Sequence, residues 1–360
     1  MPELGLEGQR KLRSSSVLVI GVGGLGIPAS VYLIAAGVGN IGIVDPDTIE
    51  MSNLHRQTIY TEADIGKSKV EVAARKLSSI NPNVRITPFR TKVGPRNGLD
   101  LLSSYDIVVD CTDNFPARYL INDACVLLHK PDVYASVFRF DGQASVFYAR
   151  RGPCLRCFLP KPPPPEFVQN CAVTGTLGVL PGILGCIQAA QSIILLTGKG
   201  HPLLGRLLMF NEMETSFEEL RVSKNSSCLV CGSKPRIKEL IDYEEFCGTA
   251  PTHERVNEIE PRELKTLLEA GKRVILLDVR EPGERELCRL EGSKFIPLGD
   301  LERKAARLRL TDDIVVYCHV GERSARAVEM LRSMGFRKVR SLKGGIRAWS
   351  MEVDRNTPTY

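Results

Sequence analysis

The sequence has 360 residues, 43% of them hydrophobic, so it exceeds the usual length of one domain and has enough apolar side chains for packed cores. Its 48 basic and 42 acidic residues leave a net charge of +6, and no run of like charge is long enough for a nucleic-acid-binding arm. The composition therefore excludes an intrinsically disordered chain and predicts two globular domains with no nucleic-acid partner.

The first elements in chain order predict a nucleotide-binding βαβ unit. An apolar strand at residues 17–20 runs into a glycine-rich turn and a helix, and a second strand at residues 41–44 ends at Asp45. Backbone N–H groups of such a turn can approach a phosphate, and an acidic residue at this distance can accept hydrogen bonds from ribose hydroxyls. The unit by itself also fits an NAD-dependent dehydrogenase, or simply tight packing of a strand on a helix. The turn reads Gly21-x-Gly23-x-x-Gly26.

Further strands and helices alternate along the chain, which is typical of an α/β fold with a mostly parallel sheet. Residues 70–77 are apolar at helical spacing, and residues 107–109 form another buried strand. Strands expected at residues 133–138 and 144–148 flank Asp141-Gly142, a hairpin signal that predicts an antiparallel addition to the sheet.

Residues 167–198 carry no charged side chain and are long enough to suggest a membrane span. Pro181, four glycines and the polar Gln188 and Gln191 interrupt the segment, and this favours a loop that leads into a buried helix. We therefore expect no membrane partner.

A polar segment without clear periodicity predicts a linker between two domains. Beyond it, residues 274–277 lead into Asp278, residues 314–317 lead into Cys318, and residues 324–331 have the pattern of a helix, which together predict a second, smaller α/β domain. The expected parts are a first domain at 1–240, a linker at 241–258 and a second domain at 259–360.

Polar side chains beyond the second strand fit a triphosphate better than a dinucleotide. A triphosphate with Mg²⁺ requires one Arg, one Lys and nearby acidic groups, and open α/β sheets bind ligands at the carboxyl ends of their strands. Taken singly, each of these charges is more often a solvated surface group. The group comprises Asp47, Asn53, Arg56, Lys69 and Asp113.

Together these motifs resemble the MoeB/ThiF adenylyltransferases, which are relatives of ubiquitin-activating enzymes. The resemblance rests on Gly21-Val-Gly-Gly-Leu-Gly26, Asp45-Pro-Asp47, Ser52-Asn-Leu-His-Arg56-Gln57, Lys69 and Cys111-Thr-Asp113-Asn114. It implies a Rossmann-like domain that uses ATP to adenylate the terminal glycine of a small ubiquitin-like sulfur carrier ending in Gly-Gly. It also implies that Arg56 and Asp113 are catalytic, that Asp113 holds Mg²⁺, and that ATP contacts Gly24, Asp45, Asp47, Asn53, Arg56, Lys69, Asp113 and Asn114.

Two cysteine pairs, Cys154-x-x-Cys157 and Cys228-x-x-Cys231, have the spacing of zinc knuckles. Four thiolates complete a tetrahedral site with no open position, so the predicted Zn²⁺ is structural. The alternative is two unrelated redox pairs. The eleven cysteines and the lack of a secretion signal favour the reducing cytoplasm, where such pairs rarely form disulfides.

A further cysteine, Cys171, resembles the residue with which some eukaryotic-type relatives form a thioester or an acyl disulfide with their carrier. The other interpretation is a small packed thiol. If a thioester forms, the chain would activate a ubiquitin-like modifier for conjugation to other proteins instead of for sulfur transfer.

The segment Cys318-His-Val-Gly-Glu-Arg-Ser324 lies between an expected strand and an expected helix. We expect loop N–H groups and Arg323 to surround the Cys318 sulfur and to stabilise a persulfide anion. The loop resembles a rhodanese active site, whereas a phosphatase loop would have one more residue between cysteine and arginine. The resemblance continues through Asp278-Val-Arg280-Glu281, Ile296-Pro-Leu298 and Gly344-Gly-Ile-Arg-Ala-Trp349.

The order of the two parts resembles the MoeZ type of fused enzyme. This implies a homodimer and a persulfide donor such as a cysteine desulfurase. The family usually begins with a helix whose arginine reaches the ATP of the partner subunit, but here Arg10 and Arg13 lie very near the first strand. That departure leaves a non-catalytic, carrier-binding scaffold as an alternative.

Overall fold

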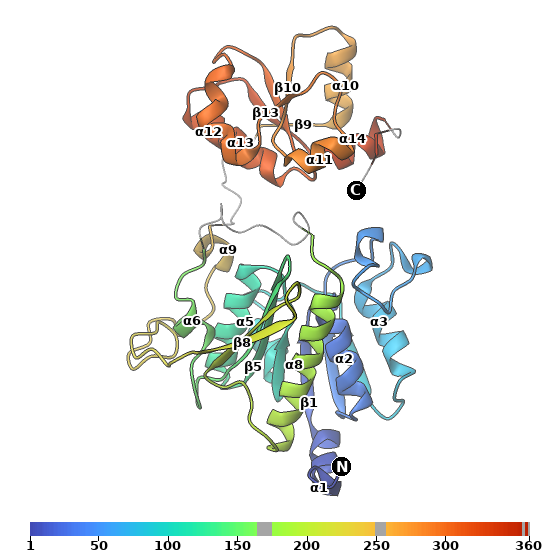
Figure 1. The fold of residues 1–360 in the computed structure, drawn as a ribbon, viewed down its shortest axis with the longest axis vertical. Helices are drawn as coiled ribbons and strands as arrows, with labels where there is room; N and C mark the ends of the chain where they lie inside the picture. Colours follow the sequence, from blue (N-terminus) through green and yellow to red (C-terminus); the bar gives the residue numbers. More distant parts are fainter. Residues whose placement is uncertain (164–174, 249–256, 355–356, 359–360) are drawn as a thin grey trace. The chain divides into compact units, whose positions relative to one another are not determined.

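A computed structural model of the chain describes residues 1–163, 175–248, 257–354 and 357–358. The chain divides into two compact units, Met1–Ala250 and Pro251–Tyr360, each built around its own sheet (Figure 1). Cys171 lies outside the described residues.

The first unit contains an eight-stranded sheet. Its strands are β1 (Ser16–Ile20), β2 (Asn40–Val44), β3 (Arg85–Phe89), β4 (Ile107–Asp110), β5 (Asp132–Phe138), β6 (Asp141–Phe147), β7 (Arg206–Asn211) and β8 (Ser216–Arg221). They lie in the order β3-β2-β1-β4-β5-β6-β7-β8. The first five are parallel and the last three antiparallel, which confirms the expected α/β fold with an antiparallel addition.

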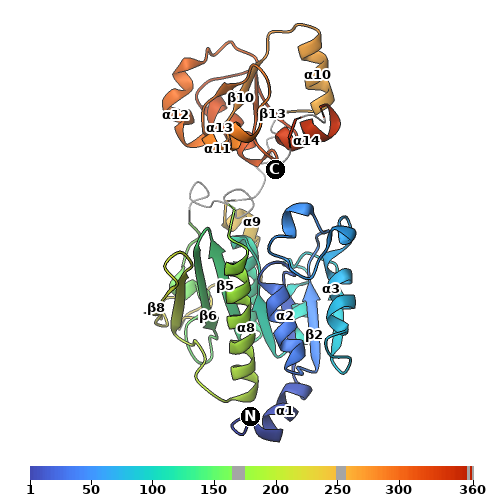
Figure 2. The same ribbon diagram turned by 45° about the vertical axis from the view of Figure 1, so that its right-hand side comes forward.

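Helices cover both faces of this sheet. They are α1 (Gly5–Ser14), α2 (Gly26–Ala35), α3 (Lys69–Ser78), α4 (Gly98–Ser103), α5 (Phe115–Leu127), α6 (Leu155–Phe158), α8 (Val179–Thr197) and α9 (Tyr243–Phe246). Side chains of α2, α3 and α8 share one core, and those of α4, α5 and α9 share the core on the opposite face. Helices α2 and α8 lie side by side (Figures 1 and 2).

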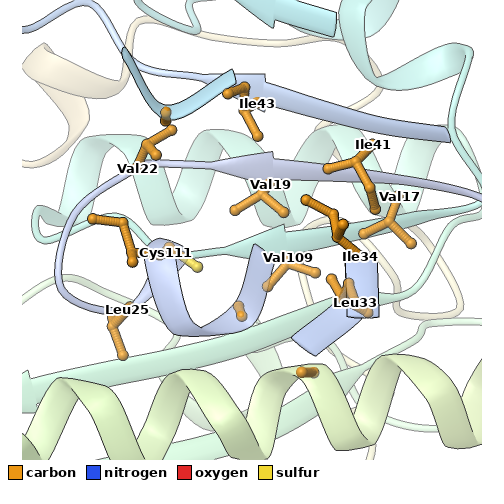
Figure 3. Close-up of a cluster of buried hydrophobic side chains, with 14 of the residues drawn as sticks. Val17, Val19, Val22, Leu25, Leu33, Ile34, Ile41, Ile43, Val109 and Cys111 are labelled. Atoms are coloured by element: carbon orange, nitrogen blue, oxygen red, sulfur yellow. The ribbon is translucent and has the colours of Figure 1, made fainter. Parts of the chain in front are cut away.

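The central strands β1, β2 and β4 carry apolar runs at residues 17–20, 41–44 and 107–109, because both faces of the sheet are buried there. On β1, Val17 and Val19 point into the core beneath α2, while Leu18 and Ile20 join the core beneath α5. Figure 3 shows the α2 side, where valines and isoleucines of three adjacent strands meet Leu33 and neighbouring helix residues. This double burial explains why the strands form continuous apolar runs in the sequence.

Helix α8 is long and apolar enough to cross a membrane by length and composition alone. It packs on β5, β6 and α2, as expected for a buried helix. A Cβ at Gly185 would lie 2.3 Å from the carbonyl oxygen of Leu25, so this glycine lets α8 approach the start of α2. Gly185, one of the glycines of the charge-free segment, therefore serves helix packing.

The expected hairpin joins β5 and β6, but its turn differs from the expectation. Phe138 pairs with Asp141, which leaves Arg139 and Phe140 as the turn, with Arg139 in the left-handed region at φ 54°. Gly142 belongs to β6, and its missing side chain makes room for Leu184 of α8, 2.8 Å from where a Cβ would be. The Asp-Gly pair therefore lies at the start of β6, where its glycine allows the contact with α8, and not in the turn itself.

The segment expected as a linker begins with residues that pack on the first unit. Helix α9 contacts α5, and the buried Tyr243 hydroxyl donates a hydrogen bond to Asp123 at 2.9 Å. Asp123 also accepts two hydrogen bonds from the buried Arg156, both at 2.8 Å. One buried ion pair therefore joins α5, α6 and α9.

Removing one member of this ion pair should strongly destabilise the first unit. Arg156→Met would leave the Asp123 carboxylate buried without its cation, and we expect a loss of about 3–5 kcal/mol in the free energy of unfolding. Denaturant unfolding of the full chain measures it, with the exposed Arg151→Met as matched control. Equal, small losses in both variants would contradict this role.

The second unit contains a five-stranded parallel sheet in the order β11-β10-β12-β13-β9. Its strands are β9 (Glu258–Ile259), β10 (Ile275–Asp278), β11 (Lys294–Phe295), β12 (Ile314–Tyr317) and β13 (Val339–Leu342). Its helices are α10 (Pro261–Glu269), α11 (Pro282–Leu287), α12 (Leu301–Lys304), α13 (Glu322–Ser333) and α14 (Gly345–Glu352). Side chains of α12 and α13 line one core of this sheet, and those of α10 and α14 line the other.

Candidate functional sites

The glycine turn closes tightly between β1 and α2. Gly21 has φ 94°, and a Cβ there would lie 2.7 Å from the carbonyl oxygen of Cys111. A Cβ at Gly26 would lie 1.9 Å from the carbonyl oxygen of Gly21. Only glycine fits at these two positions, so part of the motif is explained by backbone packing. The same turn leaves backbone N–H groups at the start of α2, where an anion is favoured.

Asp45 directly follows β2 and supports this turn through hydrogen bonds. Its carboxylate accepts hydrogen bonds from the N–H of Val22 at 2.8 Å and from the N–H of Asp47 at 2.9 Å. Burial is the main cause of a raised pKa of the Asp45 carboxyl. The carboxylate therefore shapes the turn and still has lone pairs that could accept from ribose hydroxyls.

Lys69 and Asp47 form an ion pair beside Asp45. The Nζ atom of Lys69 lies 3.0 Å from Asp47 Oδ2, with 9% of the lysine side chain exposed and 62% of the aspartate. Tyr60 is buried below them, its hydroxyl 3.1 Å from the carbonyl oxygen of Val22 and 3.2 Å from that of Lys69. The ion pair and the Tyr60 hydroxyl therefore connect the glycine turn, the loop after β2 and the start of α3.

Arg56 reaches the turn from the loop after β2. A Cβ at Gly24 would lie 3.5 Å from Arg56 Cγ and 3.1 Å from Pro181 of α8, so these residues converge. The Arg56 guanidinium donates to the carbonyl oxygen of Ser52 at 2.8 Å. Asn53 is buried and accepts from the backbone N–H of Glu50 at 3.1 Å, which gives it a role in the local fold as well.

Asp113 and Asn114 follow β4, the strand beside β1. Asp113 is exposed, and Asn114 caps α5 by accepting from the N–H of Ala117 at 3.0 Å. The preceding Asp110 is buried. Its carboxylate accepts hydrogen bonds from the N–H of Thr112 at 2.9 Å and from the hydroxyl of Thr112 at 2.6 Å. Asp45, the glycine turn and Asp113 with Asn114 therefore follow the carboxyl ends of the adjacent strands β2, β1 and β4. Lys69 joins this region through Asp47, Arg56 lies near Gly24, and Asn53 belongs to the loop after β2.

Gln188 belongs to this region and was not singled out as a site residue. Its amide donates to the carbonyl oxygens of Asp110 at 2.7 Å and Val133 at 2.9 Å, and its oxygen accepts from Cys111 at 3.3 Å. It thereby connects α8 to the end of β4 and the start of β5. A polar residue within a charge-free helix was the signal that could have identified it.

Four cysteine sulfurs gather where α6 meets the loop after β8. Their Sγ atoms all lie within 4.8 Å of one another, with 3.9 Å between Cys154 and Cys157, 3.6 Å between Cys154 and Cys228, and 3.4 Å between Cys157 and Cys231. Tetrahedral Zn–S bonds of ~2.3 Å place sulfurs roughly 3.8 Å apart. The cluster could therefore hold a metal ion such as zinc, and this agrees better with one site than with two separate redox pairs.

Cys318 follows β12 and lies below the first turn of α13. Its sulfur accepts from the N–H of Gly321 at 3.1 Å and lies 3.5 Å from the hydroxyl of Ser324. A Cβ at Gly345 would lie 2.5 Å from the carbonyl oxygen of Cys318, so the start of α14 packs directly against this loop. A sulfur at the start of a helix of twelve residues is well placed to carry negative charge.

Arg323 is placed differently from the expectation. Its guanidinium makes two hydrogen bonds to the carboxylate of Glu284 on α11, at 2.6 and 2.7 Å. The contacts described for the Cys318 sulfur are instead those to Gly321 and Ser324. Sequence spacing placed Arg323 in the correct loop, but its orientation depends on an acidic residue 39 positions earlier.

The sequence matches two known families over almost its whole length. The ThiF family profile matches residues 1–230, and the profile of the rhodanese-like domain matches residues 260–352. The adenylyltransferase and sulfurtransferase MOCS3 of Danio rerio is 40% identical over 391 residues, which cover 100% of this chain and 85% of that protein. The probable adenylyltransferase/sulfurtransferase MoeZ of Mycobacterium tuberculosis is 40% identical over 370 residues, with 100% and 93% coverage.

Solved structures share part of the fold. A crystal structure of E. coli MccB with MccA-N7isoASN has a TM-score of 0.58 and 23% identity, covering 63% of this chain and 70% of that one. A structure of E. coli MccB with ATP has a TM-score of 0.57 and 24% identity, covering 63% and 69%. At this identity the likeness concerns the fold alone.

Proposed function

Because this chain belongs to the ThiF family and ends in a rhodanese-like domain, it is an adenylyltransferase and sulfurtransferase, and we propose how its residues divide the two reactions. The first unit activates the C-terminal glycine of a small ubiquitin-like sulfur carrier with ATP. The second unit supplies sulfur from Cys318, and the carrier leaves with a C-terminal thiocarboxylate. The observation that supports the proposal is the presence in one chain of the glycine turn beside Asp45 and Lys69 and of the Cys318 loop.

In the first reaction, a carboxylate oxygen of the carrier attacks the α-phosphorus of ATP and pyrophosphate leaves. Backbone N–H groups of the glycine turn bind phosphate oxygens, and Arg56 and Lys69 offset their negative charge. Asp45 and Asn53 bind the ribose or phosphates. Asp113, with Asn114 beside it, would hold the Mg²⁺ ion, which would neutralise charge on the phosphates.

In the second reaction, the Cys318 thiolate attacks the terminal sulfur of a persulfide donor, such as a cysteine desulfurase, and the donor leaves as a thiolate. The Cys318 persulfide then attacks the carbonyl carbon of the acyl-adenylate and AMP leaves. The product is an acyl disulfide between the carrier and Cys318. A thiol reductant attacks Cys318 Sγ, forms a disulfide with it and releases the thiocarboxylate, and a further thiol reduces that disulfide to restore Cys318. Cys171 is a candidate for a covalent thioester or acyl disulfide with the carrier.

A homodimer and a cytoplasmic location complete the proposal. Helix α1 packs against α8 and carries Arg10 and Arg13 on its exposed side. One of these arginines is the candidate for a residue that reaches the ATP of the partner subunit. Both arginines lie on a helix, which supports this interpretation although the helix ends close to β1.

Mass spectrometry of candidate carriers after incubation with enzyme, Mg-ATP and a persulfide donor tests the function. We expect the mass change of replacing one carboxylate oxygen by sulfur, and only when all three components are present. A carrier joined to another protein would favour a Cys171 thioester and modifier conjugation. No ATP–pyrophosphate exchange with any carrier would favour a non-catalytic scaffold.

For the cysteine cluster we propose one structural Zn²⁺ per chain. Cys157→Ser or Cys231→Ser should remove the metal and lower stability, because a closed thiolate site contributes directly to folding. Elemental analysis and thermal unfolding check this, with Cys186→Ser on α8 as a control outside the cluster. Metal-free protein that is as stable as metal-bound protein would refute the zinc site.

A further inference from the structure

The pair formed by Arg323 and Glu284 places a negative charge beside the sulfur-carrying loop. The two hydrogen bonds of the pair are short, and only 15% of the arginine side chain and 13% of the glutamate side chain are exposed. Charges removed from water in this way interact strongly and are weakly screened by salt. Glu284 therefore offsets most of the positive charge that Arg323 brings to the loop.

Other charged groups also lie near the loop. His319, next to Cys318, lies within electrostatic reach of Glu284, Arg323 and Arg347. Burial is the main cause of its lowered pKa, so its imidazole is neutral near pH 7. The Cys318 sulfur itself is contacted by the Gly321 N–H and the Ser324 hydroxyl at the start of α13, which can stabilise negative charge there.

Sulfur donors differ in how much negative charge they bring. When a thiolate attacks the sulfane sulfur of thiosulfate, a new S–S bond forms and sulfite leaves as a dianion. When it attacks the terminal sulfur of a persulfide R–S–SH, the donor S–S bond breaks and R–S⁻ leaves with a single charge, while the proton stays on the transferred sulfur. A loop with less positive charge therefore penalises thiosulfate more than a persulfide.

We propose that Glu284 is a specificity-determining residue that selects persulfide donors over dianionic donors such as thiosulfate by neutralising Arg323. The proposal rests on the sulfurtransferase function of Cys318 and adds the chemical class of its donor. Freed from Glu284, the guanidinium would be available to bind an anionic donor or its leaving group.

The informative variant is Glu284→Gln, because glutamine keeps the size of the side chain and an oxygen that can still accept from the N–H of Glu281. The full chain is loaded from thiosulfate or from cysteine persulfide, with cyanide as sulfur acceptor in both cases. We expect kcat/KM for thiosulfate to rise on the order of tenfold, with little change for the persulfide.

Matched variants separate the pair from general charge effects. Glu286→Gln, an exposed position on the same helix, makes the same change in net charge and should leave the ratio of the two donors unchanged. Arg323→Gln leaves Glu284 uncompensated and should depress thiosulfate use more than persulfide use, a result that holds even if Glu284→Gln folds poorly. In the double variant the gain with thiosulfate should disappear.

Equal changes for both donors in Glu284→Gln and Arg323→Gln would overturn the role of Glu284 and leave the sulfurtransferase function standing. Wild-type protein that loads sulfur from neither donor would instead contradict the proposed function of Cys318. Pyrophosphate exchange, which belongs to the first unit, reports in each variant that the remainder of the chain is active.

Discussion

Cys318→Ala should abolish sulfur transfer from a persulfide donor while ATP–pyrophosphate exchange continues at the wild-type rate. The substitution removes the sulfur that accepts a hydrogen bond from the Gly321 N–H, and it leaves the loop backbone in place. Adenylation requires only the first unit, which has its own sheet and core, whereas the thiocarboxylate requires a sulfur nucleophile. The two activities should therefore separate completely in this variant.

The measurement combines pyrophosphate exchange with mass spectrometry of the carrier at a low concentration of persulfide. Cys288→Ala, another buried cysteine of the second unit, is the control and should retain sulfur transfer. Wild-type thiocarboxylate production by Cys318→Ala under these conditions would exclude the rhodanese-like unit as the sulfur relay. Production from high free sulfide alone would agree with it, because dissolved sulfide can attack the acyl-adenylate without any cysteine.

Asp113→Ala should lower carrier-dependent pyrophosphate exchange by about a hundredfold or more, the scale expected when a main electrostatic element is lost. Asp113 is exposed at the end of β4, and the hydrogen bond described for its carboxylate comes from Asn114 at 3.3 Å. The cap of α5 is made by Asn114, so the substitution should cost little stability. The expected loss is one of chemistry and not of folding.

The same assay should give a comparable loss in Arg56→Ala, because the guanidinium offsets phosphate charge that the glycine turn alone cannot. Asp100→Ala, an exposed acidic position in the first turn of α4, is the matched control and should exchange normally. Thermal unfolding of each variant separates misfolding from catalytic loss. Near-normal exchange in both Asp113→Ala and Arg56→Ala would show that ATP is bound elsewhere.

The buried polar contacts connect these two sites to the fold. Gln188 ties α8 to the last residue of β4, three positions before Asp113, through a hydrogen bond of 2.7 Å. The Asp278 carboxylate plays a similar part at the end of β10, where it pairs with Arg280 at 2.8 Å and accepts from the Tyr317 hydroxyl at 3.0 Å. In both units, buried polar side chains hold the strand ends next to the proposed reactive residues.

The sequence by itself determined the features that depend on neighbouring residues. The apolar runs of β1 and β2 predicted buried parallel strands, because both faces of such strands lose contact with water. The turn after β1 required Gly21 and Gly26 through local backbone geometry. The two Cys-x-x-Cys pairs could be assigned to one site because a tetrahedral metal needs four ligands, although they lie 74 residues apart.

Only the tertiary structure decided which distant side chains meet. The bonds from Gln188 to β4 and β5, the bond from Tyr243 to Asp123, and the pair of Arg323 with Glu284 each join positions more than 35 residues apart. Their sequence signals are single polar residues, which have no periodicity and no fixed spacing. Gly142 shows the same limit. The contact with α8 requires a glycine here, but in the sequence the Asp141-Gly142 pair cannot be distinguished from a turn signal. Such contacts depend on strand order and helix packing, because these bring the partners within hydrogen-bond distance only after the chain has folded.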